Sequence, residues 1–303
     1  MFLQNKNCYN YELRTYETGL FDTFVDVTYI ITSLDDKKRN ANIEHQLSRC
    51  IPTKQIYMVY NKIYKKCHKI LPKQIPPYDI KDAYLNIMQH SIDQNYNNIL
   101  VLENDFIYSD ILLDNTKNGD ILREIRDFFV DYSDTTFAYN LGPLFSLCYP
   151  NLNPFSVHKN TFQIILGGGT HACIFNNKIQ HDLILEKPNQ SILPFHQDIE
   201  KNIDMYLNQN YNVYFYKTPL IYQIVENTVN QNHWNDNPII HQIIMGDIRF
   251  FQLDKQPEPG FSIKYMLGFL LSYLFFFILF LFFSFFLYQL FLLYKFNIEQ
   301  RVF

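Results

Sequence analysis

Short apolar runs alternate with amphipathic stretches along the first half of the chain. Apolar, β-branched and aromatic residues are concentrated at 24–32, 56–60 and 99–102, which predicts three buried strands. Apolar residues recur every three or four positions at 37–49 and again after Asp79, a residue that can cap a helix, so a helix is predicted between successive strands. This alternation favours an α/β fold with a mainly parallel sheet flanked by helices.

The second half of the chain has a less regular pattern. Further strands are predicted within 134–142, 162–166, 172–175 and 211–216, and a helix is predicted to open at 194–198. Residues 143–160 contain three prolines and are expected to form a long loop, whereas 238–253 fits both helix and strand. The expected organisation is an irregular segment at 1–23, one α/β domain at 24–237 and a connector at 238–262.

The largest change in composition occurs at the C-terminus. No charged residue lies between Lys264 and Lys295, and most positions between them are Phe or Leu. Because about 20 apolar residues already cross the hydrocarbon core of a bilayer, residues 263–295 predict a transmembrane helix. A buried core helix is one alternative. A hairpin that enters and leaves the membrane is another, since Ser284 and Gln289 interrupt the apolar run.

The remaining composition bears on location and partners. No stretch near the start resembles a signal peptide, and only a short tail at 296–303 follows the predicted helix, which indicates a single-pass C-terminal anchor with a cytosolic domain. The five cysteines are widely spaced and form no Cys-x-x-Cys pair, which indicates reduced thiols rather than disulfides or a zinc site. A net charge of −4 argues against nucleic-acid binding.

Acidic residues follow directly on the strand predicted at 99–102. Glu103 and Asp105 stand two positions apart, with Asn104 between them. Ligands of open α/β sheets bind at the carboxyl ends of strands, and two carboxylates there can share a divalent cation that holds a diphosphate. Arg39, near the start of the first predicted helix, could contact a nucleotide phosphate. An ordinary acidic loop and a solvated basic turn are the alternatives.

Three segments resemble family 25 glycosyltransferases, which comprise lipopolysaccharide-type glycosyltransferases and collagen galactosyltransferases. They are 29–39, a strand followed by Ser-Leu and Arg39; 102–105, similar to the family's Leu-Glu-Asp-Asp; and 167–172, similar to its Gly-x-His-Ala. The chain departs from the family at Ser33, where the family has Asn, and at Asn104, where it has an acid. The resemblance covers roughly residues 24–235 and implies the Rossmann-like GT-A architecture.

The resemblance also implies a reaction and a set of site residues. A sugar would pass from a nucleotide-sugar donor, most simply a UDP-sugar, to a hydroxyl group of a glycan, lipid or protein. Mn²⁺ or Mg²⁺ would bridge the diphosphate and Asp105, while Glu103 would bind the metal through water or contact the ribose. His171 would contact donor or acceptor, unless it is a hydrogen-bonded histidine of a hairpin. His233 would be a further metal ligand, unless it belongs to a surface loop.

Asp198 is the expected catalytic base. Glycosyltransferases of the GT-A architecture often place a carboxylate at such a position, where it would deprotonate the acceptor hydroxyl. Its alternative role is a helix-capping carboxylate in the first turn of a helix, and His196 is a lesser candidate for the same pocket. Two other functions stay open. One is a degenerate, membrane-tethered sugar-nucleotide-binding or structural protein, which Asn104 favours; the other is a metal-dependent phosphoesterase.

Overall fold

The computed structural model describes residues 7–150, 157–185, 202–225 and 238–299. The described strands are β1 (Tyr9–Thr15), β2 (Val27–Thr32), β3 (Gln55–Asn61), β4 (Ile99–Glu103), β5 (Phe106–Tyr108), β6 (Phe137–Asn140), β7 (Phe145–Cys148), β8 (Thr161–Gly168), β9 (Ala172–Phe175), β10 (Asn212–Tyr216) and β11 (Ile221–Gln223). In this part of the chain, nine strands form one sheet in the order β1-β3-β2-β4-β9-β6-β10-β8-β7, and β11 pairs separately with β5.

The sheet is mixed, with a parallel core. Strands β3, β2 and β4 run parallel to one another, and β10 runs parallel to β6. The other pairs, β1 with β3, β4 with β9, β9 with β6, β10 with β8 and β8 with β7, are antiparallel. The prediction of a mainly parallel sheet is therefore correct for the β3-β2-β4 core and for the β6-β10 pair, and wrong for the other described pairs. The short apolar run of β9 could not indicate its direction, because buried strands of either orientation look alike in sequence.

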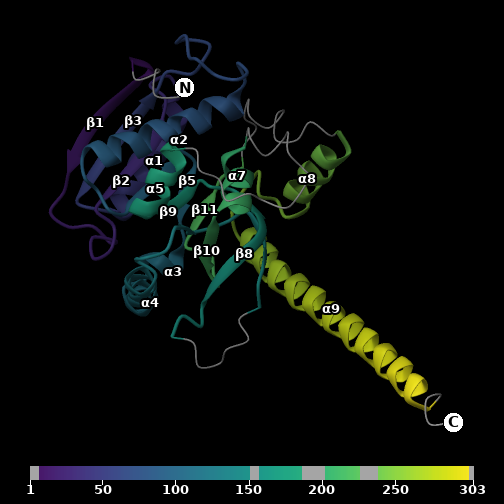
Figure 1. Cartoon of the computed structure of the whole chain (residues 1–303). Helices are drawn as coiled ribbons and strands as arrows, with labels where there is room; N and C mark the ends of the chain where they lie inside the picture. The colour runs from purple at the N-terminus through teal and green to yellow at the C-terminus, as the bar shows by residue number, and fades with distance from the viewer. Residues whose placement is uncertain (1–6, 151–156, 186–201, 226–237, 300–303) are drawn as a thin grey trace.

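Helices cover both faces of the sheet (Figure 1). On one face lie α1 (Lys37–Arg49), α3 (Asp110–Leu113) and α4 (Asn118–Asp131); on the other lie α2 (Pro76–Asp93), α5 (Asn177–Ile184) and α7 (Ile203–Asn210). Strand β4 serves both cores, since Leu100 and Leu102 pack on the first face while Ile99 and Val101 pack on the second. This confirms the predicted buried strand, and α1 confirms the helix predicted at 37–49.

The structure corrects the prediction of an irregular N-terminal segment. Residues 9–15 form the edge strand β1, which pairs antiparallel with β3 from Tyr9 opposite Asn61 onward. A disulfide joins Cys8 to Cys67, with the two Cα atoms 5.8 Å apart, so the prediction of reduced thiols is wrong for this pair. Disulfides are typical of oxidising compartments, and the bond therefore argues against the cytosolic placement expected from the sequence.

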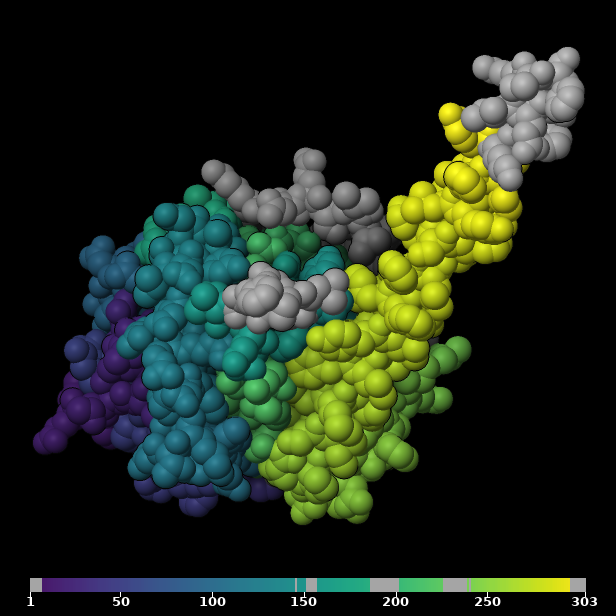
Figure 2. Space-filling view, turned by 90° about the horizontal axis from the view of Figure 1, so that it is seen from below, coloured from purple at the N-terminus to yellow at the C-terminus, as the bar shows by residue number. Residues whose placement is uncertain are grey.

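Two further helices complete the described chain. Residues 238–250 form α8 (Pro238–Phe250), and α9 (Gly260–Glu299) continues past Ser284 and Gln289 without a break, so the structure contains no membrane hairpin at this point. The stretch Gly260–Tyr294 is long and apolar enough to cross a membrane. Its first turns pack on the domain, and the remainder projects away from it (Figures 1 and 2).

Strand β7 and the start of α2 also differ from expectation. Strand β7 lies inside the segment expected to be a long loop. Its backbone pairs with β8, a more distant segment, so the local sequence pattern did not indicate a strand there. Helix α2 begins at Pro76 with Ile75 at its N-cap, so Asp79 is not the cap residue. Asp79 instead lies in the first turn and accepts a hydrogen bond from Lys69. Lys69 lies outside the helix, so helical spacing could not indicate this contact.

Candidate functional site

The acidic segment forms a tight turn at the carboxyl end of the parallel core. Strand β4 ends at Glu103 and β5 begins at Phe106, so Asn104 and Asp105 make the turn between them. Phe106 is fully buried below this turn, and the backbone of Asp105 accepts a hydrogen bond from Ile224 at 3.0 Å. Packing and hydrogen bonding therefore hold the turn at the sheet edge where α/β proteins bind ligands.

Asp105 is buried with one carboxylate oxygen unused. Its side chain is 7% exposed, and its Oδ2 atom lies 3.4 Å from Nη1 of Arg39 and accepts a hydrogen bond from Nε2 of Gln223 at 3.3 Å. Its Oδ1 atom is buried and has no hydrogen-bond partner among the described residues. Leaving a buried acceptor unsatisfied is costly, so this oxygen marks a place where a cation or a ligand donor would bind.

Arg39 reaches this turn because of how α1 begins. The side chain of Asp36 caps α1 by accepting a hydrogen bond from the backbone N–H of Arg39 at 3.1 Å. Nη1 of Arg39 donates to Oδ1 of Asn104 at 2.7 Å, and Nδ2 of Asn104 donates to Oγ1 of Thr32 at 3.4 Å. An aspartate at position 104 could not donate to Thr32, so Asn104 links Arg39 to the end of β2.

Glu103 occupies a different environment from Asp105. Burial raises the pKa of Glu103 to about 8, and the negative charges of Asp105 and Asp204 add to this effect, while Tyr84 and Arg39 oppose it. The hydroxyl of Tyr84 lies 3.1 Å from Oε1 of Glu103. Glu103 therefore keeps its proton at neutral pH unless a cation near the two carboxylates displaces it.

Asp204 is a third carboxylate of the site, and it was missed by sequence reasoning. It lies in the first turn of α7, where Oδ2 accepts a hydrogen bond from the backbone N–H of Gly169 at 3.0 Å and Oδ1 accepts one from Met205 at 2.8 Å. Burial raises its pKa. Gly169 has φ of +87°, a region that favours glycine, which helps explain the glycine run at 167–169. An acid in the first turn of a helix is too common a pattern to have indicated this role.

His171 is hydrogen-bonded through its backbone to the end of β4, next to the acidic turn. Its carbonyl oxygen accepts a hydrogen bond from the backbone N–H of Glu103 at 2.8 Å, and its fully buried ring has Nε2 3.1 Å from the carbonyl oxygen of Ile221. Burial lowers the pKa of His171, so the ring is neutral. It does not belong to a hairpin, because β8 and β9 are not neighbours in the sheet. Its contact with donor or acceptor stays a prediction.

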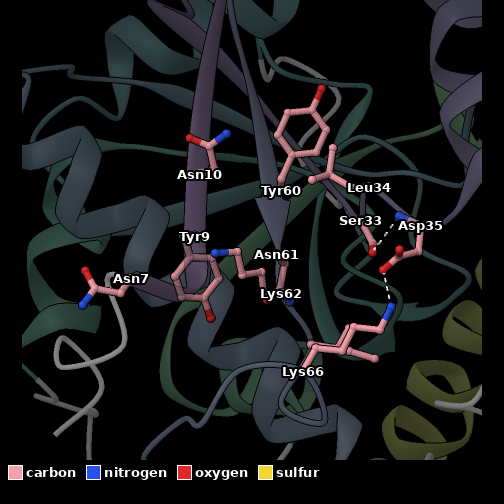
Figure 3. Close-up of a pocket in the computed structure, with 11 residues that line it drawn as sticks. Asn7, Tyr9, Asn10, Ser33, Leu34, Asp35, Tyr60, Asn61, Lys62 and Lys66 are labelled. Carbon is pink, nitrogen blue, oxygen red and sulfur yellow. Dashed lines mark hydrogen bonds and ion pairs between the residues drawn. The ribbon is translucent and has the colours of Figure 1, made fainter.

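A cavity of about 500 Å³ opens beside the ends of β2 and β3 (Figure 3). Its size is typical of a small-molecule site. Its walls combine tyrosine rings with polar and charged side chains: Asn7, Tyr9, Asn10, Ser33, Leu34, Asp35, Tyr60, Asn61, Lys62, Ile63 and Lys66. Lys66 and Asp35 form an ion pair within this wall. The cavity was not predicted, since part of its wall comes from the N-terminal segment that appeared irregular in sequence.

Hydrogen bonds connect the cavity to the acidic turn. Ser33 lines the cavity, and its carbonyl oxygen accepts a hydrogen bond from Nδ2 of Asn40 at 3.0 Å. Oγ1 of Thr32 donates to Oδ1 of Asn40 at 2.6 Å and accepts the hydrogen bond from Asn104. The cavity and the carboxylates therefore belong to one connected region at the carboxyl edge of β3, β2 and β4.

The described residues limit the kind of metal site that this region could form. In the described part of the chain, no group of three or more His, Cys, Asp or Glu side chains could hold a metal ion by itself. Glu103 and Asp105, with the unpartnered Oδ1, fit a cation held by one or two carboxylates, water and substrate phosphates, as Mg²⁺ commonly is. Asp198, His196 and His233 lie outside the described residues, so their roles stay predictions.

Comparison with known proteins gives distant similarity of fold. No family model matches the sequence, and no curated protein matches it. The A197 protein from STIV shares 8% identity, with a TM-score of 0.34 over 66% of this chain and 85% of that chain. A glycosyltransferase involved in the glycosylation of the major capsid of PBCV-1 shares 10% identity, with a TM-score of 0.33 over 68% of this chain and 97% of that chain. An apo UDP-glucose pyrophosphorylase shares 13% identity, with a TM-score of 0.29 over 63% and 72% of the two chains.

Proposed function

We propose that this chain is a membrane-anchored glycosyltransferase that uses a nucleotide-sugar donor and a divalent cation. The observation that carries the proposal is the joint position of a ligand-sized cavity and two carboxylates at the carboxyl edge of the parallel core. The resemblance of residues 29–39, 102–105 and 167–172 to family 25 glycosyltransferases supports the same reaction. A UDP-sugar is the first candidate donor, and the acceptor is a hydroxyl group of a glycan, lipid or protein.

The cavity and the acidic turn would divide the donor between them. The nucleoside would enter the cavity, where Tyr9 and Tyr60 offer aromatic surface and Asn10 offers hydrogen bonds. The diphosphate would extend toward Asp105, whose carboxylate Arg39 holds in place. Mn²⁺ or Mg²⁺, when bound there, would neutralise the charge that develops on the departing nucleotide.

Two carboxylates are candidates for the catalytic base. Asp198 follows from the sequence pattern, and Asp204 follows from its place beside Glu103. In the reaction, the acceptor oxygen bonds to the anomeric carbon, the bond from that carbon to the diphosphate breaks, and the acceptor proton passes to the base. The raised pKa of Asp204 suits a group that must accept a proton near neutral pH.

A nucleotide-sugar-binding protein without transferase activity is the second candidate. The observation that favours it is the raised pKa of Glu103, because a protonated carboxyl is a poor metal ligand at neutral pH. The cavity and Arg39 would still bind a nucleotide in such a protein. The two candidates therefore share a binding site and differ in whether a cation completes it.

Calorimetry on the full chain in nanodiscs tests the proposal. UDP and then GDP are titrated with and without Mn²⁺ into the unmodified protein, Asp105→Asn and the control Asp120→Asn, which changes an exposed carboxylate on α4. We expect Mn²⁺-dependent binding that only Asp105→Asn abolishes. Release of UDP from UDP-sugars with formation of a glycosylated acceptor would then establish transfer, and binding without transfer would support the second candidate. A folded protein that binds neither nucleotide would refute both.

A further inference from the structure

The first turns of α9 belong structurally to the domain. One stripe of this helix is directed inward, and its members are Phe261, Lys264, Tyr265, Gly268, Ser272 and Phe276. A Cβ atom on Gly268 would lie 2.5 Å from the carbonyl oxygen of Ser146, so only glycine permits this close approach. The backbone N–H of Cys148 donates to Oγ of Ser272 at 3.0 Å. The helix is therefore seated on β7 before it leaves the domain.

The outward face of these same turns is apolar. Ile263, Met266 and Leu270 are 40%, 63% and 62% exposed, although the opposite side of the helix is packed against the domain. A helix that covers a domain in water normally has polar residues on its outer face. These side chains therefore require an apolar environment that the described part of the chain does not supply.

Helix α8 also has an apolar outward face opposite a face that packs on the domain. Ile248 is fully buried on its inner side, whereas Ile239, Ile243 and Phe250 on its outer side are 69%, 65% and 80% exposed. The exposed three are four and seven positions apart and so share one face of the helix. A helix with apolar residues on both faces is typical of a membrane surface rather than of a water-facing layer.

Direct contacts connect α8 to the start of α9. Lys264 of α9, which is 7% exposed, forms an ion pair with Asp247 of α8. A Cβ atom on Gly260 would collide with the carbonyl oxygen of Phe251, so the chain between the helices also packs tightly. Figure 1 shows α8 on the same side of the domain as the start of α9. The ion pair and the packed glycine therefore connect the two helices near their apolar outer faces.

The length of the apolar stretch identifies the occupant of this surface. Tyr265 to Tyr294 comprises 30 residues, or roughly 45 Å of helix. The hydrocarbon core is only about 30 Å thick, and the bilayer with its headgroups is about 40–45 Å thick. The portion from Tyr273 to Tyr294, 22 residues or roughly 33 Å, suffices for the core. The turns that remain fall in the headgroup layer of a moderately tilted helix.

We propose that α8 and the outward face of the first turns of α9 lie in the headgroup layer of a lipid bilayer. The domain is then held in a fixed orientation on the membrane instead of hanging from a flexible connector. Arg249, which is exposed on α8, suits contact with anionic headgroups. The inference rests on the membrane anchor of the proposed function and is independent of sugar transfer.

Quenching of tryptophan by brominated lipids tests this surface in the full chain. The only tryptophan is first removed by Trp234→Phe, and one tryptophan is then introduced by Ile243→Trp, Val130→Trp or Phe282→Trp. Val130 is the matched control, because it is an apolar residue on helix α4 with 66% exposure, against 65% for Ile243. Phe282→Trp reports on the membrane-crossing part of α9. Each variant is reconstituted into two sets of bilayers, one with bromine at shallow positions of the acyl chains and one with bromine near the chain ends.

We expect strong loss of fluorescence for Ile243→Trp with shallow bromine and for Phe282→Trp with deep bromine, and little for Val130→Trp with either. Quenching at Phe282→Trp together with equal, weak quenching at Ile243→Trp and Val130→Trp would overturn the inference while leaving the anchor intact. Weak quenching at all three positions would refute the anchor as well. A blue-shifted but unquenched Ile243→Trp would show that another protein surface, not lipid, covers α8, and would equally overturn the inference.

Discussion

Two groups of charged side chains lie at the same end of the sheet, and they differ in how completely their side chains are hydrogen-bonded or ion-paired. The first surrounds Lys69, whose ammonium group has no exposed surface. It lies 2.5 Å from Oδ1 of Asp79 and donates to Asn61 at 2.6 Å and to the Tyr9 hydroxyl at 2.7 Å, while Tyr9 donates to Asp82. Burial lowers the pKa of Lys69 although the aspartates oppose this effect.

The second group is the acidic site, where not every carboxylate oxygen has a partner. Asp105 has a buried oxygen without a partner in the described chain, and burial raises the pKa of both Glu103 and Asp204. Arg39 forms an ion pair with Asp105. The comparison shows that burial of charge alone does not mark a functional site. In the Lys69 group each charged side chain has a hydrogen-bonding partner, whereas the acidic site leaves one oxygen of Asp105 without a partner in the described chain.

The largest expected effect on stability comes from removal of the cation in the first group. Lys69→Met would leave Asp79 and Asp82 buried without a positive charge, so the free energy of unfolding should fall by about 3–5 kcal/mol. Lys66→Met is the control, because Lys66 pairs with Asp35 at the surface and should cost about 0–1 kcal/mol. Thermal unfolding in nanodiscs measures both. Equal losses of unfolding free energy for the two variants would show that Lys69 contributes no more to stability than a surface ion pair.

A smaller loss is expected for the hydroxyl that joins β1 to this group. Tyr9→Phe removes hydrogen bonds to Lys69 and Asp82, both charged, and should lower the free energy of unfolding by about 1.5–3 kcal/mol. Tyr60→Phe serves as the comparison, since its hydroxyl bonds Glu12 at the exposed edge of the sheet. The same unfolding assay applies. A Tyr9 variant as stable as the Tyr60 variant would contradict the comparison.

Removal of charge from the acidic site should change stability little but should abolish ligand binding. Asp105→Asn keeps an acceptor for Gln223 and places no new charge in the interior, so we expect stability to change by less than about 1 kcal/mol. Mn²⁺-dependent nucleotide binding, measured by calorimetry, should nevertheless be lost. A loss of stability as large as that of Lys69→Met would mean that Asp105 is part of the fold rather than a ligand.

The last prediction concerns the pH dependence of stability. The pKa of Glu103 is raised from 4.5 to about 8 in the folded chain, so the folded state binds this proton more tightly than the unfolded state. Its contribution to stability is therefore fully present below about pH 4.5 and is lost as the pH rises through about 8. The melting temperature of the metal-free protein should fall across this interval more steeply than that of Glu103→Gln. Parallel curves for the two proteins would contradict the raised pKa.

Local pattern in the sequence determined the elements that depend on nearby residues. The apolar run at 99–102, the helical spacing at 37–49 and the long apolar stretch after Lys264 each became the expected strand or helix. The acidic turn followed from its position directly after β4. These features succeed because burial of a strand or helix face imposes a period of two or about 3.6 residues on the sequence itself.

Tertiary structure alone decided how these elements meet. The insertion of β9 beside β4, the pairing of β1 with β3 and the Cys8–Cys67 disulfide all join segments far apart in the chain, which no local period encodes. Asp204 enters the site for the same reason. Asn104 appeared in sequence to be a missing acid, but hydrogen bonds to Arg39 and Thr32 make it a link between helix and strand. A residue's chemistry is written in the sequence, but its charge state and its partners depend on what the fold packs around it.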